Sequence, residues 1–410
     1  MLAELPQELI DRIIDEIALD VSRDTREIIR DVKNLSLFSP KFHPRSRAYL
    51  FRTLEINSNT FPRWCGDVRP GRDGPSRFVT SIRYHPSFPE AERQKGPLEG
   101  LSRSPSHMSA FTNLRILHFV DISLRHTKYL TCFGGLVPAV RELWLEDCQM
   151  DITKFVSFVQ PFANLERLRL MRPQCPDENK LQNLDMVERP PLKGTLECHQ
   201  PDVAVFKNFP TFIQEFSLLP TAFSTIVFRG GLDTPTAANQ LLAASRTTLT
   251  KLTFGHNSEV QFPCFDPSVQ LTASKPHPAV DNNINLKHLS ALKELELSTL
   301  DVRVLPRVLR TVKSNKLKTI RFFLLVYQHQ LEDGVAEPMR RSWEKLDVEL
   351  CVLANRVQAA SRYSGGELQV KFVDLDSTTP EWLVGNVARM YFPRSHAHKY
   401  ISFSVDPVYN

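Results

Sequence analysis

The chain has 410 residues, of which 42% are hydrophobic and 24% are charged, the balance of an ordinary folded protein long enough for about two or three domains. Its 51 basic and 46 acidic residues leave a formal net charge of only +5, whereas nucleic-acid binding usually needs a broad basic face, so we expect no nucleic-acid partner. The sequence contains no run of about 18 uninterrupted apolar residues. Its acidic, amphipathic start lacks the basic segment followed by an apolar segment that is typical of a signal peptide. Without such an apolar run we expect no contact with a membrane. Seven scattered cysteines without a CxxC pair are typical of reduced thiols, so we expect a location in the cytoplasm, the nucleus or both.

The first predicted helix begins at Pro6. Proline suits the first helical position, because its missing N–H is not needed there and its φ is already set. Glu8 adds a negative charge near the positive end of the helix dipole. Apolar side chains then recur at helical spacing and form one wide face: Leu9, Ile10, Ile13, Ile14 and Ile17. No catalytic group lies on this face, so it is suited to packing or to the capture of a partner.

Two further helices and a strand follow. The second helical pattern begins at Asp24 with the form of a capping box, and it should end near Ser39, since the proline that follows disfavours helix in the residue before it. A third, basic segment opens at Pro44. Residues 53–56 then alternate polar and apolar side chains, which predicts a strand.

Four short motifs stand in a fixed order within these segments. They are Leu5-Pro6 with Glu8-Leu9, Leu35-Ser36-Leu37-Phe38-Ser39, the stretch from Arg45 to Leu50-Phe51, and Leu54-Glu55-Ile56. Over roughly residues 3–57 this arrangement resembles an F-box, of the variety found in large families of fungal F-box proteins. Two features differ from that pattern: Phe42-His43 stands where such motifs commonly carry a tryptophan, and residues 20–25 lengthen the join between the first two helices.

The resemblance implies a non-catalytic receptor. An F-box docks on the Skp-family adaptor of a cullin–RING ubiquitin ligase, and the remainder of the chain would hold a protein substrate, whose identity the sequence does not reveal. The resemblance assigns adaptor contact to one set of residues: Leu5, Pro6, Leu9, Ile10, Ile13 and Ile14. A second set shares contact and packing roles: Leu35, Leu37, Phe38, Leu50 and Phe51.

An alternative interpretation needs no ligase. The N-terminal helices would then be an amphipathic cap on a repeat scaffold that binds a partner, because the end repeats of a solenoid need covering. Exposure of the apolar face around Leu5, Pro6, Leu9 and Ile10 would favour partner capture, and its complete burial on the repeats would favour the cap.

A loose repeat of the form LxxLxL runs through the rest of the chain. It stands at residues 114–119, 140–145, 165–170, 249–254, 292–297 and 317–322, with weaker copies at 79–84 and 213–218. Residues 192–198 and 368–372 could supply further strands. A short strand of this kind buries one side only, so copies spaced by about 20–29 residues become stable when they stack on a shared core, as in leucine-rich repeats. Cys148 takes the usual asparagine or cysteine position of such a repeat.

We therefore expect an α+β fold with three parts. A small three-helix F-box at residues 1–57 precedes an irregular leucine-rich-repeat-like α/β solenoid, or horseshoe, at residues 58–375, and residues 376–410 form a helical C-terminal cap and tail. Helical returns between strands are predicted at residues 152–158 and 239–242. An ordinary α/β domain with leucine-rich strands is the alternative.

The C-terminal part carries its own signals. Apolar residues at spacings of 3, 4, 3 and 4 predict a long helix: Trp343, Leu346, Leu350, Leu353 and Val357. A further helix is predicted to begin at Thr379-Pro380, with a cap residue followed by proline, and residues 400–405 alternate like an edge strand. These elements would close the array of repeats.

No motif predicts an enzyme. The sequence lacks a GxSxG elbow, a GxxxxGK[ST] phosphate loop, a GxGxxG turn and an HExxH pair, and its fifteen glycines leave few phosphate-binding loops. Acidic pairs such as Glu146 with Asp147 are explained more simply as solvated strand ends than as acid–base catalysts. His396 and His398 have no further ligand at metal-site spacing, so we expect no metal and no cofactor.

Overall fold

A computed structural model describes an N-terminal helical region followed by a parallel-strand, solenoid-like sheet. The described residues are 5–20, 25–57, 75–85, 111–124, 137–149, 152–173, 191–199, 216, 221–229, 235–255, 284–299, 305–326, 337–360, 367–374, 386, 389–398 and 401–407. The chain divides into two compact units, Met1–Pro176 and Asp177–Asn410. The helical domain expected at residues 1–57 lies inside the first unit, and the cap expected at residues 376–410 lies inside the second.

The first unit begins with the helical region. It comprises α1 (Gln7–Ala18), α2 (Thr25–Phe38), the short 3-10 helix η2 (Pro40–Phe42) and α3 (His43–Leu50). Pro6 was expected at the first helical position but stands one residue before it, where its carbonyl accepts hydrogen bonds from two backbone N–H groups of the first turn at 3.1 and 3.2 Å. The end of α2 at Phe38 confirms the predicted stop before Pro40.

A small apolar core holds these helices together. Its centre is formed by Ile10, Ile14 and Phe42, which are all buried. Three partly buried side chains from the start of the chain, α2 and α3 pack against it: Leu5, Leu35 and Tyr49. The apolar stripe of α1 therefore serves first to hold the helical region together.

A polar contact ties α3 to α1. Arg45 donates from Nε and Nη2 to the two carboxylate oxygens of Asp15 at 2.6 and 2.7 Å, and the Tyr49 hydroxyl donates to the same carboxylate at 3.0 Å. The Arg45 guanidinium also lies 5.5 Å from the centroid of the Tyr49 ring. Because a bidentate pair fixes geometry as well as adding energy, this contact sets how α3 packs on α1.

The strands described in the first unit are parallel and follow the order of the chain. They are β1 (Thr53–Ile56), β2 (Ser81–Tyr84), β3 (Ile116–Val120), β4 (Glu142–Glu146) and β5 (Arg167–Met171). Each LxxLxL copy from residues 79–84 to 165–170 contributes one of them, which confirms these predictions. Alternate residues are buried along β1, β2, β4 and β5, whereas β3 also buries His118 between Leu117 and Phe119. Phe158 of α7 (Ile152–Val159) packs on Phe119 with ring centroids 5.4 Å apart. α7 therefore covers the apolar side of this sheet.

The chain turns in the same way after successive strands of the first unit. Asp121, Asp147 and Arg172 follow β3, β4 and β5 and have positive φ values of 51°, 52° and 47°. One position after Asp147, Cys148 is fully buried, and its thiol donates to the Phe119 carbonyl of the preceding strand at 3.5 Å. At this repeat position a buried side chain satisfies the backbone of the neighbouring repeat.

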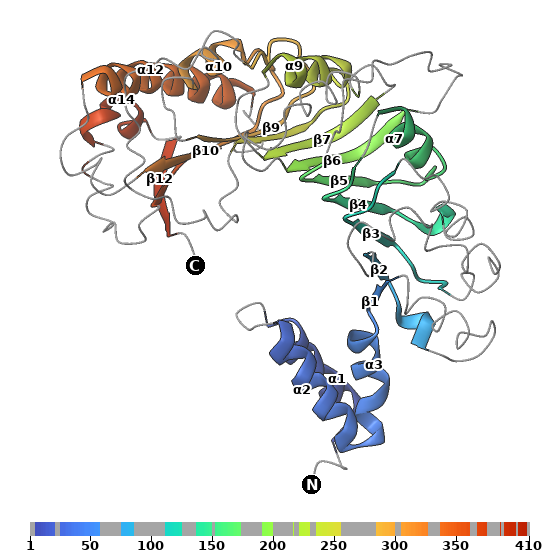
Figure 1. The fold of residues 1–410 in the computed structure, drawn as a ribbon. Helices are drawn as coiled ribbons and strands as arrows, with labels where there is room; N and C mark the ends of the chain where they lie inside the picture. Colours follow the sequence, from blue (N-terminus) through green and yellow to red (C-terminus); the bar gives the residue numbers. More distant parts are fainter. Residues whose placement is uncertain are drawn as a thin grey trace, which may run out of the picture. The chain divides into compact units, whose positions relative to one another are not determined.

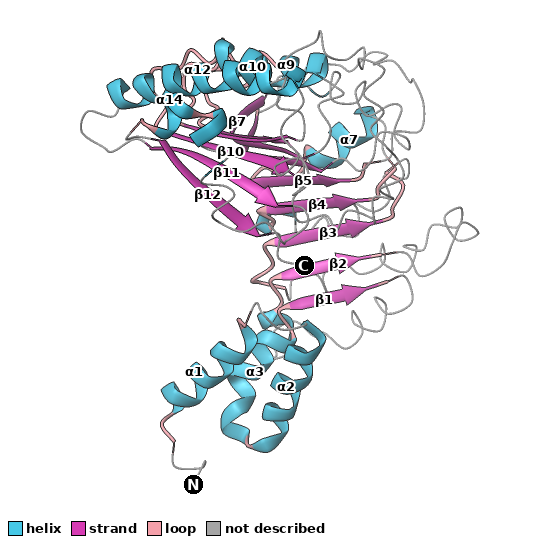
Figure 2. Cartoon of the chain, turned by 90° about the vertical axis from the view of Figure 1, so that its left-hand side faces the viewer, coloured by secondary structure: helices cyan, strands magenta, loops and turns pink. Residues whose placement is uncertain are grey.

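The second unit follows the same plan. Its strands are parallel and in chain order: β6 (Leu192–His199), β7 (Thr221–Arg229), β8 (Lys251–Gly255), β9 (Glu294–Thr299), β10 (Thr319–Val326), β11 (Glu367–Asp374) and β12 (Ile401–Pro407). The helices α9 (Pro235–Ala244), α10 (Leu305–Thr311) and α12 (Glu337–Ala360) lie together on one side of these strands (Figures 1 and 2). Their side chains and the buried alternate residues of the strands form the core of this unit.

One strand of the second unit departs from the predicted repeat. The copy expected at residues 213–218 is described only at Phe216, which is helical, and the observed strand is β7. The register of β7 against β6 shifts at Ser224, which stands opposite no residue of β6, although its hydroxyl donates to the Gly194 carbonyl of that strand at 3.2 Å. The buried Phe223 and Ile226 are therefore three residues apart, and a bulge of this kind hides the alternation that marks a strand.

The C-terminal predictions are confirmed in part. All five residues of the predicted stripe, Trp343, Leu346, Leu350, Leu353 and Val357, are buried on α12, and β12 is the predicted final strand. Asp347 on the same helix is buried and accepts hydrogen bonds from the N–H groups of Arg394 and Ser395 at 3.2 and 2.8 Å, which caps α14 (Pro393–His396). The start of the helix expected from Thr379 lies outside the described residues, and of the residues that follow it, 386 and 389–391 are helical.

Candidate functional site

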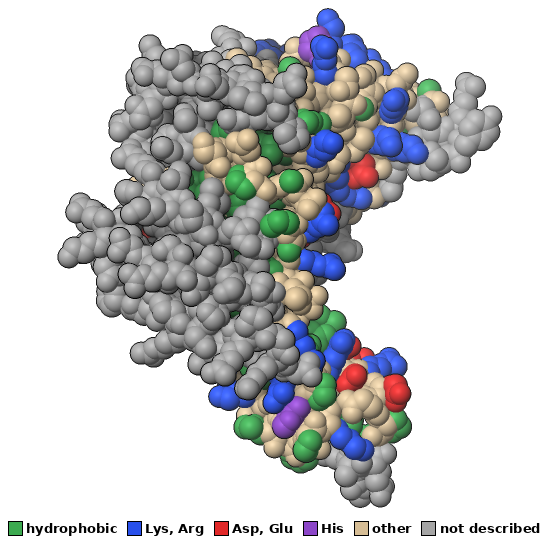
Figure 3. All heavy atoms as spheres, turned by 90° about the vertical axis from the view of Figure 1, so that its right-hand side faces the viewer, with side chains coloured by type: hydrophobic (Ala, Val, Ile, Leu, Met, Phe, Trp, Pro, Cys, Tyr) green, Lys and Arg blue, Asp and Glu red, His purple; other side chains and the backbone are tan. Residues whose placement is uncertain are grey.

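Large apolar side chains are exposed on the helical region. Leu37 and Phe38 at the end of α2 expose 75% and 68% of their surface, and Leu9 and Ile13 on α1 are also exposed. We call these four residues the apolar helix surface. Hydrophobic side chains lie among charged ones over this part of the molecule, at the bottom of Figure 3. Because burying one such side chain contributes about 1.5–3 kcal/mol, the surface is suited to a protein partner.

The apolar helix surface combines residues of two helices. The Gln7 side-chain amide donates to the Lys41 carbonyl at 2.9 Å, so the first turn of α1 lies beside η2. η2 begins two residues after Phe38, and Leu9 belongs to that first turn of α1. The start of α1 and the end of α2 therefore lie at the same end of the helical region.

The other residues predicted to contact an adaptor occupy different positions. Pro6 is exposed. The half-buried members of the set are Leu5, Leu35, Leu50 and Phe51. Ile10 and Ile14 are fully buried in the helical core, so their side chains pack against neighbouring helices rather than reach a partner. The wide stripe of α1 thus divides into an inner edge at positions 10 and 14 and an outer edge at positions 9 and 13.

The ion pair between Arg45 and Asp15 shifts the pKa values of both residues. Hydrogen bonds from Arg45 lower the pKa of the Asp15 carboxyl, against the opposing effect of partial burial, and the Tyr49 hydroxyl lowers this pKa further. The same contact with Asp15 raises the pKa of Arg45. Both partners are therefore charged at neutral pH, and the pair holds α3 against α1.

A second candidate surface lies on the sheet of the first unit. On the side opposite the apolar core, the strand register places one residue from each of β1 to β5 side by side: Glu55, Arg83, His118, Trp144 and Arg169. We call these five residues the outward row. Each follows the buried central aliphatic residue of its strand by one position, which is the signal that locates the row once the repeats are aligned. Sequence reasoning based on spacing within one segment does not find it.

Trp144 is the centre of the contacts within the outward row. Its ring centroid lies 5.3 Å from that of His118, and the Arg169 guanidinium lies over the ring, 4.9 Å from its centroid. The indole N–H donates to the Glu142 carboxylate at 3.3 Å. The ring is therefore held from three sides while it stays half-exposed.

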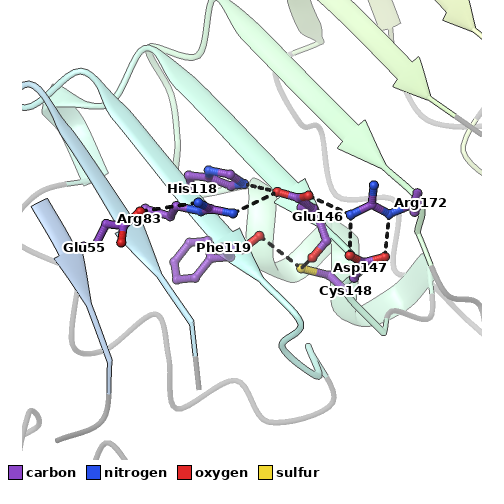
Figure 4. A network of polar contacts seen from close by, with 8 residues as sticks. All are labelled: Glu55, Arg83, His118, Phe119, Glu146, Asp147, Cys148 and Arg172. Atoms are coloured by element: carbon purple, nitrogen blue, oxygen red, sulfur yellow. Dashed lines mark hydrogen bonds and ion pairs between the residues drawn. The ribbon is translucent and has the colours of Figure 1, made fainter. Parts of the chain in front are cut away.

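A carboxylate network lies beside the outward row (Figure 4). Glu146 accepts hydrogen bonds from His118 Nε2 at 2.9 Å and from Arg172 at 2.7 Å, and Arg83 lies 3.7 Å away. Arg172 also donates to both oxygens of Asp147, at 2.8 and 2.6 Å. The expectation of a solvated strand end is wrong for Glu146, since three strands and the turn after β5 contribute to an ion-paired cluster around it.

His118 is neutral in this cluster at neutral pH. Burial lowers the pKa of the imidazole below its ordinary value, the Glu146 carboxylate acts in the opposite direction, and the positive charges of Arg83 and Arg169 reinforce the lowering. A neutral ring with its proton on Nε2 donates to Glu146. His118 thus positions the carboxylate that also receives Arg172.

The described residues offer little for covalent or metal chemistry. Within this part of the chain, no group of three or more His, Cys, Asp or Glu side chains is placed to hold a metal ion. Burial raises the pKa of the Cys148 thiol to about 12, which keeps it protonated and poorly nucleophilic. None of the helices described is long and apolar enough to cross a membrane.

No model of a known protein family matches the chain, and no curated protein matches its sequence. The resemblance to an F-box therefore rests on the motifs of residues 3–57. The candidate function rests on these motifs together with the apolar helix surface and the outward row.

Proposed function

We propose that this chain is an F-box-type substrate receptor. Its helical region docks on the Skp-family adaptor of a cullin–RING ubiquitin ligase, and its solenoid-like sheet holds a protein substrate. The observation that carries the proposal is the apolar helix surface, which is exposed although the same helices have a core of their own. Three of its members, Leu9, Leu37 and Phe38, belong to the motifs that carry the F-box resemblance.

The exposure of these residues argues against a simple cap. A cap buries its apolar face on the repeats that it covers, whereas Leu37 and Phe38 are among the most exposed large apolar side chains described. The residues of α1 that are buried, Ile10 and Ile14, pack with Phe42 and with other side chains of the helical region. The helices therefore satisfy their own packing and keep a further apolar surface exposed to solvent.

The mechanism of such a receptor is proximity. A chain that binds the adaptor with one region and the substrate with another raises the effective concentration of the substrate beside the ubiquitin-loaded enzyme. The receptor itself then needs two binding surfaces rather than catalytic groups. The apolar helix surface supplies the first, and the sheet region supplies the second.

Binding of the full chain to a purified Skp-family adaptor tests the proposal, measured by pull-down and by calorimetry. Leu9→Asp and Phe38→Asp each place a charge within the apolar helix surface. Each should weaken binding about ten- to hundredfold, because the lost burial is worth about 1.5–3 kcal/mol.

Leu19→Asp is the matched control. Leu19 is exposed in the same helical region but at the other end of α1, so the same substitution there should leave adaptor affinity unchanged. Circular dichroism shows whether each variant keeps its helices. An equal loss in Leu19→Asp and Leu9→Asp would contradict the assigned surface. A wild-type chain that does not bind the adaptor would favour the alternative, an interaction scaffold without a ligase role.

A further inference from the structure

We propose that Ser290 is a phosphorylation site, at which the phosphate fastens together the turns that precede β9 and β10. The two turns are residues 284–293 and 312–318, and we call them the lysine turns. The inference goes beyond the proposed function and concerns a different part of the chain. Its test does not need the adaptor, so the two proposals can fail separately.

The first lysine turn presents Ser290 to solvent. Three buried leucines anchor this turn in the core of the second unit: Leu286, Leu289 and Leu292. Ser290 is exposed, and its N–H donates to the His288 carbonyl at 2.9 Å, which closes the backbone of the turn. The Ser290 hydroxyl has no hydrogen-bond partner among the residues that the structure describes. It is therefore available to accept a phosphoryl group.

The second lysine turn packs against the first. The Lys318 N–H donates to the Lys293 carbonyl at 2.8 Å. The Ser314 hydroxyl donates to the Leu292 carbonyl at 2.7 Å and lies 3.4 Å from the Ser290 carbonyl. The middle of the second turn is therefore beside Ser290.

Exposed lysines lie on both turns around this point. They are Lys287 and Lys293 on the first turn, and Lys313, Lys316 and Lys318 on the second. The two on the first turn stand three residues before and three residues after Ser290, and Lys313 and Lys316 stand on either side of Ser314. Within the described part of the chain, none of the five has an ion-pair partner. A phosphate on Ser290 thus has uncompensated lysines of both turns near it.

The lysine turns contain no carboxylate that would compete with the phosphate. Neither residues 284–293 nor residues 312–318 include an aspartate or a glutamate. Glu294, which follows the first turn, exposes 48% of its side chain and already pairs with Lys251 at 3.2 Å. The positive charge of the turns is therefore not balanced by their own residues.

The arrangement suits a doubly charged anion. Lys293 and Lys318 directly precede paired strands at matching positions, so their backbones are about 4.8 Å apart and their like charges repel. A phosphoserine carries a charge of about −1.5 to −2 at neutral pH and three strong acceptor oxygens. One such group can neutralise two lysines and accept hydrogen bonds from both turns. The modification therefore stabilises the packing of one repeat on the next.

A protein kinase supplies the phosphoryl group from ATP. The Ser290 hydroxyl oxygen forms a bond to the γ-phosphorus, the bond from that phosphorus to the oxygen of the β-phosphate breaks, and ADP leaves. The hydroxyl proton passes to the catalytic aspartate of the kinase. Lys287 suits a kinase that selects a basic residue three positions before its serine. Ser314 should not react, because it is buried and its hydroxyl donates to a carbonyl.

Incubation of the full chain with ATP and a kinase of this basic-directed class tests the site itself. Mass spectrometry of proteolytic fragments should find phosphate on Ser290 and none on Ser314. Ser290→Ala should remove the phosphate from this fragment. An unmodified Ser290 in the wild-type chain would contradict the assignment.

Phosphoserine incorporated at position 290 during translation tests the consequence. It should raise the midpoint of thermal unfolding by about 2–4 °C, and this gain should shrink as salt rises. Amide hydrogen exchange in both lysine turns should slow at least about tenfold. A chain that also carries Lys287→Gln, Lys313→Gln and Lys316→Gln should lose both effects. Lys345→Gln is the matched control, because it removes the same charge from an exposed position on α12 and should keep them.

Two further outcomes overturn the inference: phosphoserine at position 290 that leaves the stability and the exchange unchanged, and an equal gain in the triple lysine variant. Two crossed measurements separate it from the adaptor proposal. Ser290→Ala should bind the adaptor like the wild type, and Leu9→Asp should be phosphorylated on Ser290 like the wild type.

Discussion

The helical region and the sheet of the first unit place their apolar side chains in opposite ways. The helical region has a small core around Ile14 and Phe42, yet it leaves Leu37 and Phe38 at its surface. The strands β3 to β5 bury their leucine and phenylalanine side chains, and on the other side of the sheet His118, Trp144 and Arg169 lie beside half-buried apolar residues such as Ile116. Two adjoining parts of one unit therefore present two different kinds of surface.

The difference indicates how each surface binds. A repeat buries its apolar side against the next repeat. The polar and charged side chains that it exposes distinguish partners by their charge and hydrogen bonding. The helices already have a core of their own, and an apolar surface left on such helices gains most from a protein partner. The variants below separate packing from binding in both regions, beginning with the largest expected loss of stability.

Phe119→Ala should cause the largest loss. Phe119 is fully buried and makes edge contacts with Tyr84 and Phe158, with ring centroids 6.1 and 5.4 Å apart. Removing the ring should lower the free energy of unfolding by about 3–5 kcal/mol, measured by urea denaturation. Ile116→Ala on the outward side of the same strand is the control and should cost far less. Similar losses for both variants would mean that the sheet is covered on both sides.

Ile14→Ala tests the small core of the helical region. Ile14 is fully buried there, so its truncation should cost about 2–4 kcal/mol and speed amide hydrogen exchange in α1 to α3. Ile13→Ala removes the same atoms one position away, at an exposed site, and should change stability by less than about 0.5 kcal/mol. If Ile13→Ala lowers the free energy of unfolding more than Ile14→Ala does, then position 13 rather than position 14 faces the core of the helical region.

This contrast marks the limit of the sequence-based prediction for the candidate site. The apolar positions from Leu9 to Ile17 form one face so wide that periodicity does not divide it. Which edge turns inward depends on Phe42 and Leu35, which reach the core from other elements. The pattern therefore predicted the helix, whereas the separation of contact from packing residues depends on tertiary packing.

The strands were more predictable, for a physical reason. An LxxLxL copy forces alternate residues inward, and this holds for β2 to β5 and for β8 to β10. The rule fails at β7, where Ser224 is an extra residue between buried positions. The outward row was not predicted, because the contact between Trp144 and Arg169 depends on pairing across strands and on side-chain conformation.

Asp15→Asn should have a smaller effect that depends on pH. The pair with Arg45 is partly exposed, so its loss should cost about 1 kcal/mol at neutral pH. The folded-state pKa of Asp15 lies below the unfolded value of about 3.9, so the unfolded state binds the proton first. The contribution is complete above that value and is lost as the pH falls through the folded-state pKa.

Thermal unfolding across this acidic range measures the effect of Asp15→Asn. The variant should lack the part of the acid dependence that Asp15 provides. Glu16→Gln is the matched control, because the pair of Glu16 with Arg12 is well exposed and contributes little. If the stability of Asp15→Asn falls with acid in the same way as that of the wild type, the contact between Asp15 and Arg45 does not hold α3 in solution.

His118→Gln examines the sheet in a different pH range. The folded-state pKa of His118 is lowered, so the unfolded chain takes up a proton near about pH 6.5 while the folded chain resists it. Wild-type stability should therefore fall as the pH drops below about 6.5 toward the folded-state pKa. Glutamine can still donate to Glu146 but does not titrate, so the variant should lose this part of the dependence. An unchanged slope between pH about 5 and 6.5 would mean that His118 is solvated.

Leu37→Ser should have the smallest effect on stability and the clearest effect on binding. Leu37 exposes 75% of its surface, so its truncation should change the free energy of unfolding by less than about 0.5 kcal/mol. If the apolar helix surface binds the adaptor, the same change should lower adaptor affinity at least severalfold, because the side chain is buried only in the complex. Unfolding and calorimetric binding measured on one preparation decide the matter. A large loss of stability would mean that another part of the chain covers Leu37 in solution, as the cap interpretation requires. A loss of affinity alone means that this leucine is exposed in the unbound chain because a partner covers it.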